Sequence, residues 1–120
     1  MGHIRIPVTF IGPTGGRRTL TMLVDTGATY TWVPEKWLRA LGVRPLRPMG
    51  FRLGDGRVIH RRLGEATVEI EGIRATTVVV FARQRDATVL GVQALEGVAL
   101  EVDPAREALR PMEPLFLATA

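Results

Sequence analysis

The sequence predicts a small all-β domain with one or two short helices, and three patterns support this fold class. Polar and apolar residues alternate in several short runs, such as residues 65–71, which is typical of strands with one buried face. Residues 77–81 are apolar almost without interruption, so they should form a central strand. Turn residues rich in glycine and proline separate these runs. With 120 residues the chain should form a single domain, residues 1–120.

The chain opens with a predicted hairpin. Residues 4–11 alternate well enough for a strand, residues 12–16 are a strong turn, and residues 20–24 return as a largely buried second strand. Because Pro7 has no N–H group, its part of the first strand is expected at a sheet edge.

The second predicted strand ends in Asp25-Thr26-Gly27. A carboxylate at the end of an apolar strand is expected to be partly desolvated, and such groups often carry acid or base chemistry. Thr26 adds a side-chain donor, and Gly27 permits a tight turn or the close approach of another chain. The tripeptide alone is also ordinary turn chemistry, so its context has to decide between these interpretations.

A third strand and a helix are predicted next. Residues 28–33 read as a strand, Pro34 as the first helical residue, and Gly42 as the end of the helix. Trp37 lies on the apolar stripe of this helix and is expected to pack in the core. Residues 43–50 contain two prolines and are predicted to be irregular.

The remaining elements alternate between strands and turns. Residues 51–59 form a predicted hairpin with Gly54-Asp55-Gly56 at a mobile tip, which by itself could be an ordinary surface connection. Gly72 should turn the strand at residues 65–71 into the one that contains residues 77–81. A loop at residues 83–86 then leads to Thr88-Val89-Leu90-Gly91 and a short helical pattern at residues 92–96.

Three of these elements resemble the retropepsin-like (clan AA) aspartic proteases, in that family's order. Residues 24–29 resemble the active-site loop, residues 51–59 look like the flap hairpin, and residues 88–91 look like the second apolar-apolar-Gly motif. The small single-domain bacterial and archaeal members are the most similar, because their loop runs into a Pro-led helix as residues 31–36 do here. The resemblance covers nearly the whole chain and implies a closed β-barrel with a flap, forming half of a two-fold symmetric dimer.

The resemblance also bears on the C-terminal part. Residues 103–111 could form a helix, since Asp103 is a good N-cap and Pro104 suits the first helical position. The resemblance implies instead a turn at these two residues and a strand through Leu109, which we predict. Residues 1–6 and the apolar tail at residues 114–118 are expected at the interface with a second copy of the chain.

The activity implied by the resemblance is that of an aspartic endopeptidase. The chain has one Asp-Thr-Gly and no internal repeat of it, so a homodimer would be needed to place two Asp25 carboxylates around a catalytic water. Thr26 would brace the two loops, and Gly27 would offer its carbonyl to a peptide or protein substrate. The implied substrate-binding residues are Leu23, Ala28, Thr29, Tyr30, Trp32, Leu53, Gly54, Asp55, Gly56 and Val89.

One departure from the retroviral pattern concerns a charged pair. Thr29 and Val92 stand where retroviral enzymes carry an acidic residue and an arginine. Both members of that ion pair are absent together, so neither leaves a buried charge without a partner.

Composition argues against several other classes. There is no cysteine, and His3 and His60 have no ligand partner at metal-binding spacing, so we expect no metal and no cofactor. The arginines are scattered through predicted turns and loops, which favours solvated surfaces and no nucleic-acid partner. No apolar signal segment and no stretch near the roughly 18 residues that span a bilayer are evident, so we expect a cytoplasmic protein without a membrane partner.

Two alternatives remain open from the sequence. The chain could be a catalytically silent dimeric module of the same fold that binds peptides or proteins, in which Asp25 would be replaceable. It could also be a nucleic-acid-binding β-barrel in which Asp-Thr-Gly is accidental, a possibility raised by the net charge of +4.

Overall fold

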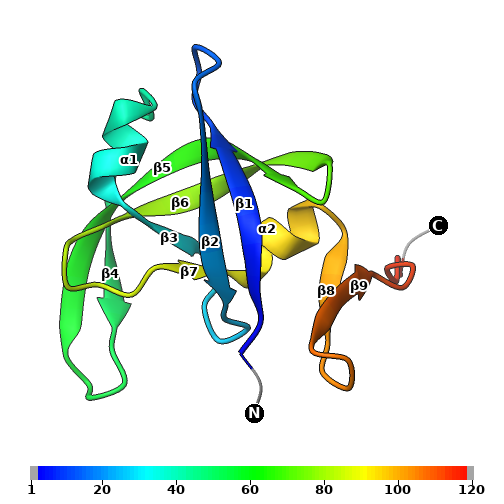
Figure 1. The fold of residues 1–120 in the computed structure, drawn as a ribbon. Coiled ribbons are helices and arrows are strands. Elements are labelled where there is room, and N and C mark those ends of the chain that lie inside the picture. Colours follow the sequence, from blue (N-terminus) through cyan, green and yellow to red (C-terminus); the bar gives the residue numbers. More distant parts are fainter. Residues whose placement is uncertain (1–2, 119–120) are drawn as a thin grey trace.

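The computed structural model describes residues 3–118, and its main elements are strands (Figure 1). In chain order these elements are β1 (Arg5–Ile11), β2 (Arg17–Val24), β3 (Thr31–Pro34), α1 (Glu35–Ala40), β4 (Pro48–Arg52), β5 (Val58–Ile70), β6 (Ile73–Ala82), β7 (Val89–Leu90), α2 (Val92–Gly97), β8 (Leu100–Asp103) and β9 (Ala108–Pro111). This arrangement confirms the predicted all-β class with two short helices. Within residues 3–118, no helix combines the length and the apolar character needed to cross a membrane.

The strand pairings run in a circuit around the molecule. The order is β1-β2-β7-β3-β6-β5, and residues 9–11 of β1 pair with residues 67–69 of β5, which brings the circuit back to its start. Residues 5–8 of β1 pair with β2 alone, so Pro7 lies on an edge as expected. Strand β4 pairs with the part of β5 that lies outside this circuit, while β8 and β9 form a separate two-stranded sheet.

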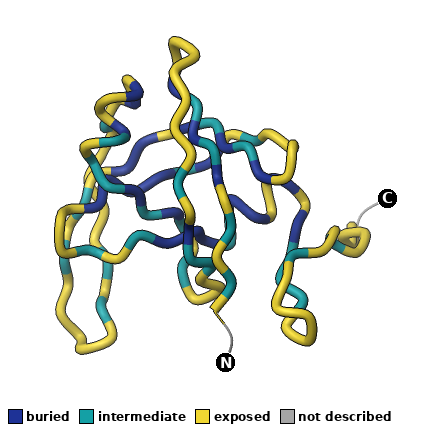
Figure 2. Tube along the Cα trace, in the orientation of Figure 1, coloured by how far each residue is buried: buried dark blue, intermediate teal, exposed yellow. Residues whose placement is uncertain are grey.

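The core fills the inside of this circuit. Strand β6 lies between β3 and β5, and its Val79 and Val80 are fully buried, which confirms the central strand predicted from the apolar run. Phe10 of β1, Met22 of β2 and Leu90 of β7 are fully buried as well. Figure 2 shows the buried segments gathered at the centre, whereas the hairpin tips and the C-terminal tail are exposed.

Strand β5 is unusually long and belongs to two structures at once. Its residues 63–70 pair with β6 in the barrel, and its residues 58–62 pair with β4 in the flap, the hairpin formed by β4, the turn at residues 53–57 and the start of β5. Gly64 marks the junction, because a Cβ atom there would lie 2.8 Å from the Phe81 ring and 3.1 Å from the Arg44 carbonyl oxygen. Close packing around Gly64 therefore fixes the point at which the flap leaves the barrel.

Two predicted boundaries were wrong. Residues 48–50 belong to β4 and are not irregular, because pairing with β5 orders them and Pro48 is tolerated at the first position of an edge strand. Strand β3 covers residues 31–34, not residues 28–33, and Pro34 ends this strand instead of beginning the helix. Trp37 packs against the core as expected, and the Arg18 guanidinium lies 3.5 Å from the centre of its ring.

The C-terminal part contains the predicted turn and strand. Asp103 ends β8, and its Oδ1 accepts hydrogen bonds from the backbone N–H groups of Ala105 and Arg106, which caps the turn before β9. The alternative helix at residues 103–111 is therefore wrong. In the tail, Leu115, Phe116 and Leu117 have exposed fractions of 77%, 90% and 76% in the single chain. Their burial against a second copy stays a prediction, as does that of residues 3–6; residues 1 and 2 lie outside the described part.

Candidate active site

The Asp25 carboxylate is oriented by its own loop. Strand β2 ends at Val24, and the Asp25 N–H donates to the Leu90 carbonyl oxygen at 3.0 Å, which ties the loop to β7. The Gly27 N–H donates to Asp25 Oδ1 at 2.9 Å, and the Ala28 N–H donates to the Asp25 carbonyl oxygen at 3.1 Å. Asp25 is nevertheless exposed in the single chain. The expected partial desolvation is thus not supplied by the chain's own fold.

A network of hydrogen bonds joins this loop to the segment between β7 and α2. The Val92 and Gln93 N–H groups donate to the carbonyl oxygens of Ala28 and Thr29, at 2.9 and 3.0 Å. These bonds use the backbone of residues 28 and 29, which explains why β3 begins later than predicted. The same two hydrogen bonds join the Asp25 loop to the start of α2 beside Thr29 and Val92, the two positions at which this chain lacks the expected ion pair.

Thr31 is a supporting residue that sequence reasoning missed. Its side chain is fully buried, and its hydroxyl oxygen accepts a hydrogen bond from the Gly91 N–H at 3.0 Å. Gly91 in turn has no room for a side chain, because a Cβ atom would lie 2.3 Å from the Tyr30 carbonyl oxygen. A hydroxyl between apolar strand residues was the available signal, since a buried polar group needs a partner.

A cleft of about 550 Å³ lies beside the carboxylate, between the Asp25 loop and the flap. Both segments lie on the same side of the barrel (Figure 1). Of the predicted site residues, those that line the cleft are Asp25, Gly27, Ala28, Thr29, Tyr30, Trp32, Leu53, Gly54 and Val89. Their roles in catalysis and binding stay predictions.

Four predicted site residues do not line the cleft of the single chain. Leu23 is half-buried in β2, where it pairs with Val89 of β7, and Thr26 is exposed in the loop. Asp55 binds its neighbour Arg57 at the flap tip, with 2.7 Å between Arg57 Nε and Asp55 Oδ2. Gly56 forms the flap turn with a φ of 90°, a conformation that glycine adopts without strain.

Several cleft residues were not singled out from the sequence. They are Met49, Phe51, Arg52, Ile59, Arg85, Asp86 and Ala87. The rings of Trp32 and Phe51 meet edge to face, with 4.8 Å between their centres, so the β3 wall of the cleft contacts the flap directly. The alternation of apolar residues within 51–59 was the available signal for Phe51 and Ile59.

Arg61 and Asp86 form a bidentate ion pair beside the cleft. Arg61 Nε and Nη2 donate to the two carboxylate oxygens of Asp86, at 2.6 and 2.9 Å, and the two side chains are only 12% and 11% exposed. The interpretation of Arg61 as a solvated residue was therefore wrong. The pair links the base of the flap to the loop between β6 and β7, and the Arg83 N–H also donates to Asp86.

The Arg61 side chain, assisted by the Arg83 N–H, holds the pKa of Asp86 below its ordinary value, although burial opposes this shift. A depressed pKa in the folded state adds stability above the unfolded pKa of about 4, and this stability is lost as the pH falls further. Asp86→Asn should therefore lower the free energy of unfolding by about 2 kcal/mol at pH 7, because Arg61 loses its partner. The deficit should shrink at pH 3, as urea denaturation would measure.

Glu96→Gln, on the exposed side of α2, is the control for this variant and should match the parent protein at both values of pH. An Asp86→Asn deficit of the same size at pH 3 and pH 7 would contradict the assigned role of the carboxylate.

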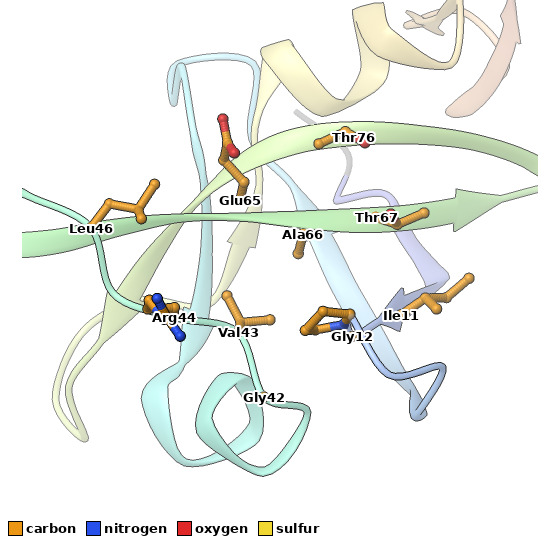
Figure 3. A pocket seen from close by; sticks show the side chains of 11 residues that line it. Ile11, Gly12, Gly42, Val43, Arg44, Leu46, Glu65, Ala66, Thr67 and Thr76 are labelled. Carbon is orange, nitrogen blue, oxygen red and sulfur yellow. The ribbon is translucent and has the colours of Figure 1, made fainter.

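A second hollow, of about 380 Å³, lies elsewhere on the barrel and shares no lining residue with the first (Figure 3). Ala66 of β5 points toward Val43 and Gly12 across it, whereas the Glu65 side chain points to the other face of the strand. Glu65 is the one carboxylate among its lining residues, and within residues 3–118 no backbone N–H group orients it in the way that the Gly27 N–H orients Asp25. The cleft beside Asp25 is therefore the candidate active site.

Together, the barrel, the flap and the loop that presents Asp25 make up the fold of the retropepsin-like aspartic protease class. Residues 14–97 match the family described as "gag-polyprotein putative aspartyl protease", and the chain belongs to this family. The matched span contains the Asp25 loop, the flap and Gly91.

Comparison with solved structures supports the assignment of the fold. The simian foamy virus (mac) protease, determined in solution, has a TM-score of 0.55 with this chain and 21% sequence identity. The similarity covers 77% of this chain and 91% of the viral one. No curated protein matches the sequence.

Proposed function

We propose that the chain is an aspartic endopeptidase that hydrolyses peptide bonds as a homodimer, with one Asp25 from each subunit. The observation that carries this proposal is the Asp25 carboxylate itself, which its loop orients toward a cleft and which its own subunit leaves exposed. A second copy placed on a two-fold axis would cover this carboxylate and bring an identical one opposite it.

The reaction would use a water molecule held between the two carboxylates. Two like charges a few ångströms apart cannot both ionise comfortably, so the pair holds one proton. The ionised carboxylate takes a proton from the water molecule while the water oxygen attacks the peptide carbonyl carbon, and the protonated carboxyl group gives its proton to the carbonyl oxygen. The C–N bond of the resulting gem-diol then breaks as its nitrogen takes the proton of one carboxyl group and the other carboxylate takes a hydroxyl proton, which leaves one proton on the pair. In the dimer, Thr26 would brace the two loops.

An extended peptide would lie between the loop and the flap, as a strand added to their exposed backbone edges. Gly27 would offer its carbonyl oxygen to the peptide backbone. Apolar side chains in the cleft, such as Trp32, Phe51 and Val89, favour substrates with apolar residues next to the cut. Closure of the flap, whose tip contains Gly54 and Gly56, would exclude water and orient the bond to be cleaved.

The first test is incubation with a mixed peptide library, with and without a statine-type inhibitor, and analysis of the products by mass spectrometry. We expect inhibitor-sensitive cuts flanked by apolar residues. A dimer that binds these peptides without cleaving any of them would instead support the silent binding module.

Activity per mole of chain should rise with protein concentration. Since each subunit supplies one Asp25, only the dimer is complete, and dilution below the dimer dissociation constant removes the complete site. Initial rates over a concentration series, compared with the molar mass from analytical ultracentrifugation, would measure this. A constant activity per mole from a chain that sediments as a monomer would contradict the proposal.

A further inference from the structure

The fold gathers arginines that are separated in the sequence around a third pocket, of about 270 Å³, which we name the arginine pocket. It lies where α1, the flap base and the end of β6 meet, and its lining residues are Glu35, Arg39, Pro48, His60, Arg61, Arg62, Phe81 and Arg83. Arg39, Arg62 and Arg83 are exposed, as the sequence interpretation expected, but the fold brings them together instead of leaving them scattered.

The charges of the arginine pocket are not balanced. Arg61 is neutralised by Asp86, and Arg39 has only a distant partner, because 3.7 Å separate its Nη2 from Glu35 Oε2. Within residues 3–118, neither Arg62 nor Arg83 forms an ion pair with a carboxylate. Four arginines therefore line the pocket, and among the described residues Arg62 and Arg83 have no carboxylate within ion-pair distance, which leaves an excess of two positive charges at this place.

Binding of a doubly charged oxyanion would relieve this imbalance. Guanidinium groups donate pairs of parallel N–H groups, a geometry that suits the oxygens of phosphate and carboxylate groups and that chloride cannot match. A phosphate group carries nearly two negative charges at pH 7, so it balances the excess charge better than a single carboxylate does. With a volume of about 270 Å³, the pocket has room for a phosphate group and for part of an ester group attached to it. Phe81 is 2% exposed, so His60 presents the one accessible aromatic ring of the pocket, too little for a platform on which successive bases stack. These features favour a small anion over a polynucleotide.

We propose that the arginine pocket is a binding site for an oxyanion of the phosphate class, either inorganic phosphate or a phosphomonoester. Arg62 and Arg83 would bind it directly, from the flap base and from the end of β6. Arg62 pairs with Pro48 at the start of β4, so the bound anion would tie both strands of the flap to the barrel. The site is separate from Asp25, and its existence does not depend on the proposed peptidase activity.

The test is calorimetric titration of the full chain with inorganic phosphate, at constant ionic strength and with chloride as the reference anion. We expect saturable binding of phosphate and a rise in Tm on its addition. Arg62→Gln and Arg83→Gln should each weaken phosphate binding about tenfold or more, because each removes charge-assisted hydrogen bonds. Neither variant should lower the Tm without phosphate, since each reduces repulsion among cations.

Arg106→Gln is the matched control, because Arg106 is exposed in the turn between β8 and β9 and its loss removes the same charge. Its phosphate affinity should stay within about twofold of the parent protein, as expected for a distant screened charge. Titration with O-phosphoserine, a phosphomonoester, distinguishes the two sources of the anion.

Three results would overturn the proposal. One is the absence of saturable binding of either anion, and another is equal affinity of the parent protein and both pocket variants. The third is binding of a single-stranded oligonucleotide that is tighter than phosphate binding, falls steeply with salt and weakens equally in Arg106→Gln. That last pattern would indicate diffuse attraction to the basic surface instead of a built site.

Discussion

Asp25→Asn should reduce peptide hydrolysis by at least about a thousandfold while leaving the fold and the dimer in place, because an amide cannot take the proton from the attacking water. The hydrogen bond from the Gly27 N–H to Asp25 Oδ1 can persist, since the asparagine side chain retains a carbonyl oxygen. Initial rates on a peptide identified from the library measure the loss, and circular dichroism verifies the fold.

Mixing the variant with the parent protein tests whether both subunits contribute to one site. If Asp25→Asn chains exchange freely into dimers, an equal mixture contains about one quarter fully active dimers, so its activity per parent chain should fall by about half. Activity that depends only on the amount of parent chain would show that each Asp25 acts alone and would contradict the shared site.

Asp103→Asn is the control, because it makes the same chemical change at the turn between β8 and β9, where an asparagine can also cap. Its activity should equal that of the parent protein. Peptide cleavage that survives in Asp25→Asn, with unchanged sensitivity to the inhibitor, would leave the binding module as the better account.

Gly91→Ala should lower the free energy of unfolding by about 3 kcal/mol or more, a large effect for the addition of one methyl group. The new Cβ would lie 2.3 Å from the Tyr30 carbonyl oxygen and 2.9 Å from that of Thr29. Both atoms belong to the backbone of the Asp25 loop, so relief of the clash must move the loop and break its bonds to α2. Denaturant unfolding measures the loss.

Gly54→Ala provides the matched comparison for stability, because no atom lies within 4 Å of the place that a Cβ would take there and the φ of Gly54 is not positive. Its free energy of unfolding should change by no more than about 0.5 kcal/mol. Equal stability of the two variants would show that the Asp25 loop accommodates a side chain at Gly91. The close contact between this loop and Gly91 would then not be needed for the stability of the candidate site.

Local patterns were sufficient for the parts of the fold that depend on local chemistry. The alternation of residues 4–11, the turn at Gly72 and the apolar run at residues 77–81 each produced the expected element. The errors occurred where partners distant in sequence determine the structure. Residues 28 and 29 leave the strand because residues 92 and 93 bind their carbonyl oxygens, and residues 48–50 join a strand because β5 pairs with them.

The same distinction separates the predicted from the missed parts of the site. Asp25, Gly27 and Val89 belong to motifs that are contiguous in the chain, so the sequence predicts their position beside the cleft. Arg61 and Asp86 are 25 residues apart, and nothing in either local segment indicates that they meet. The buried hydroxyl of Thr31 and its bond to Gly91 likewise depend on packing across the barrel.

Because β5 runs without a break from the barrel into the flap, the attachment of the flap and its length depend on different residues of the same strand. Its inner residues keep register with β6, and the packing around Gly64 fixes the point of departure, whereas the outer residues pair with β4 alone. Extending both arms by two residues would lengthen the hairpin by about 7 Å and preserve which side chains face the cleft. One extra residue in a single arm would turn that face outward. Insertions of two residues in each arm can therefore change the length of the flap while the barrel keeps its structure.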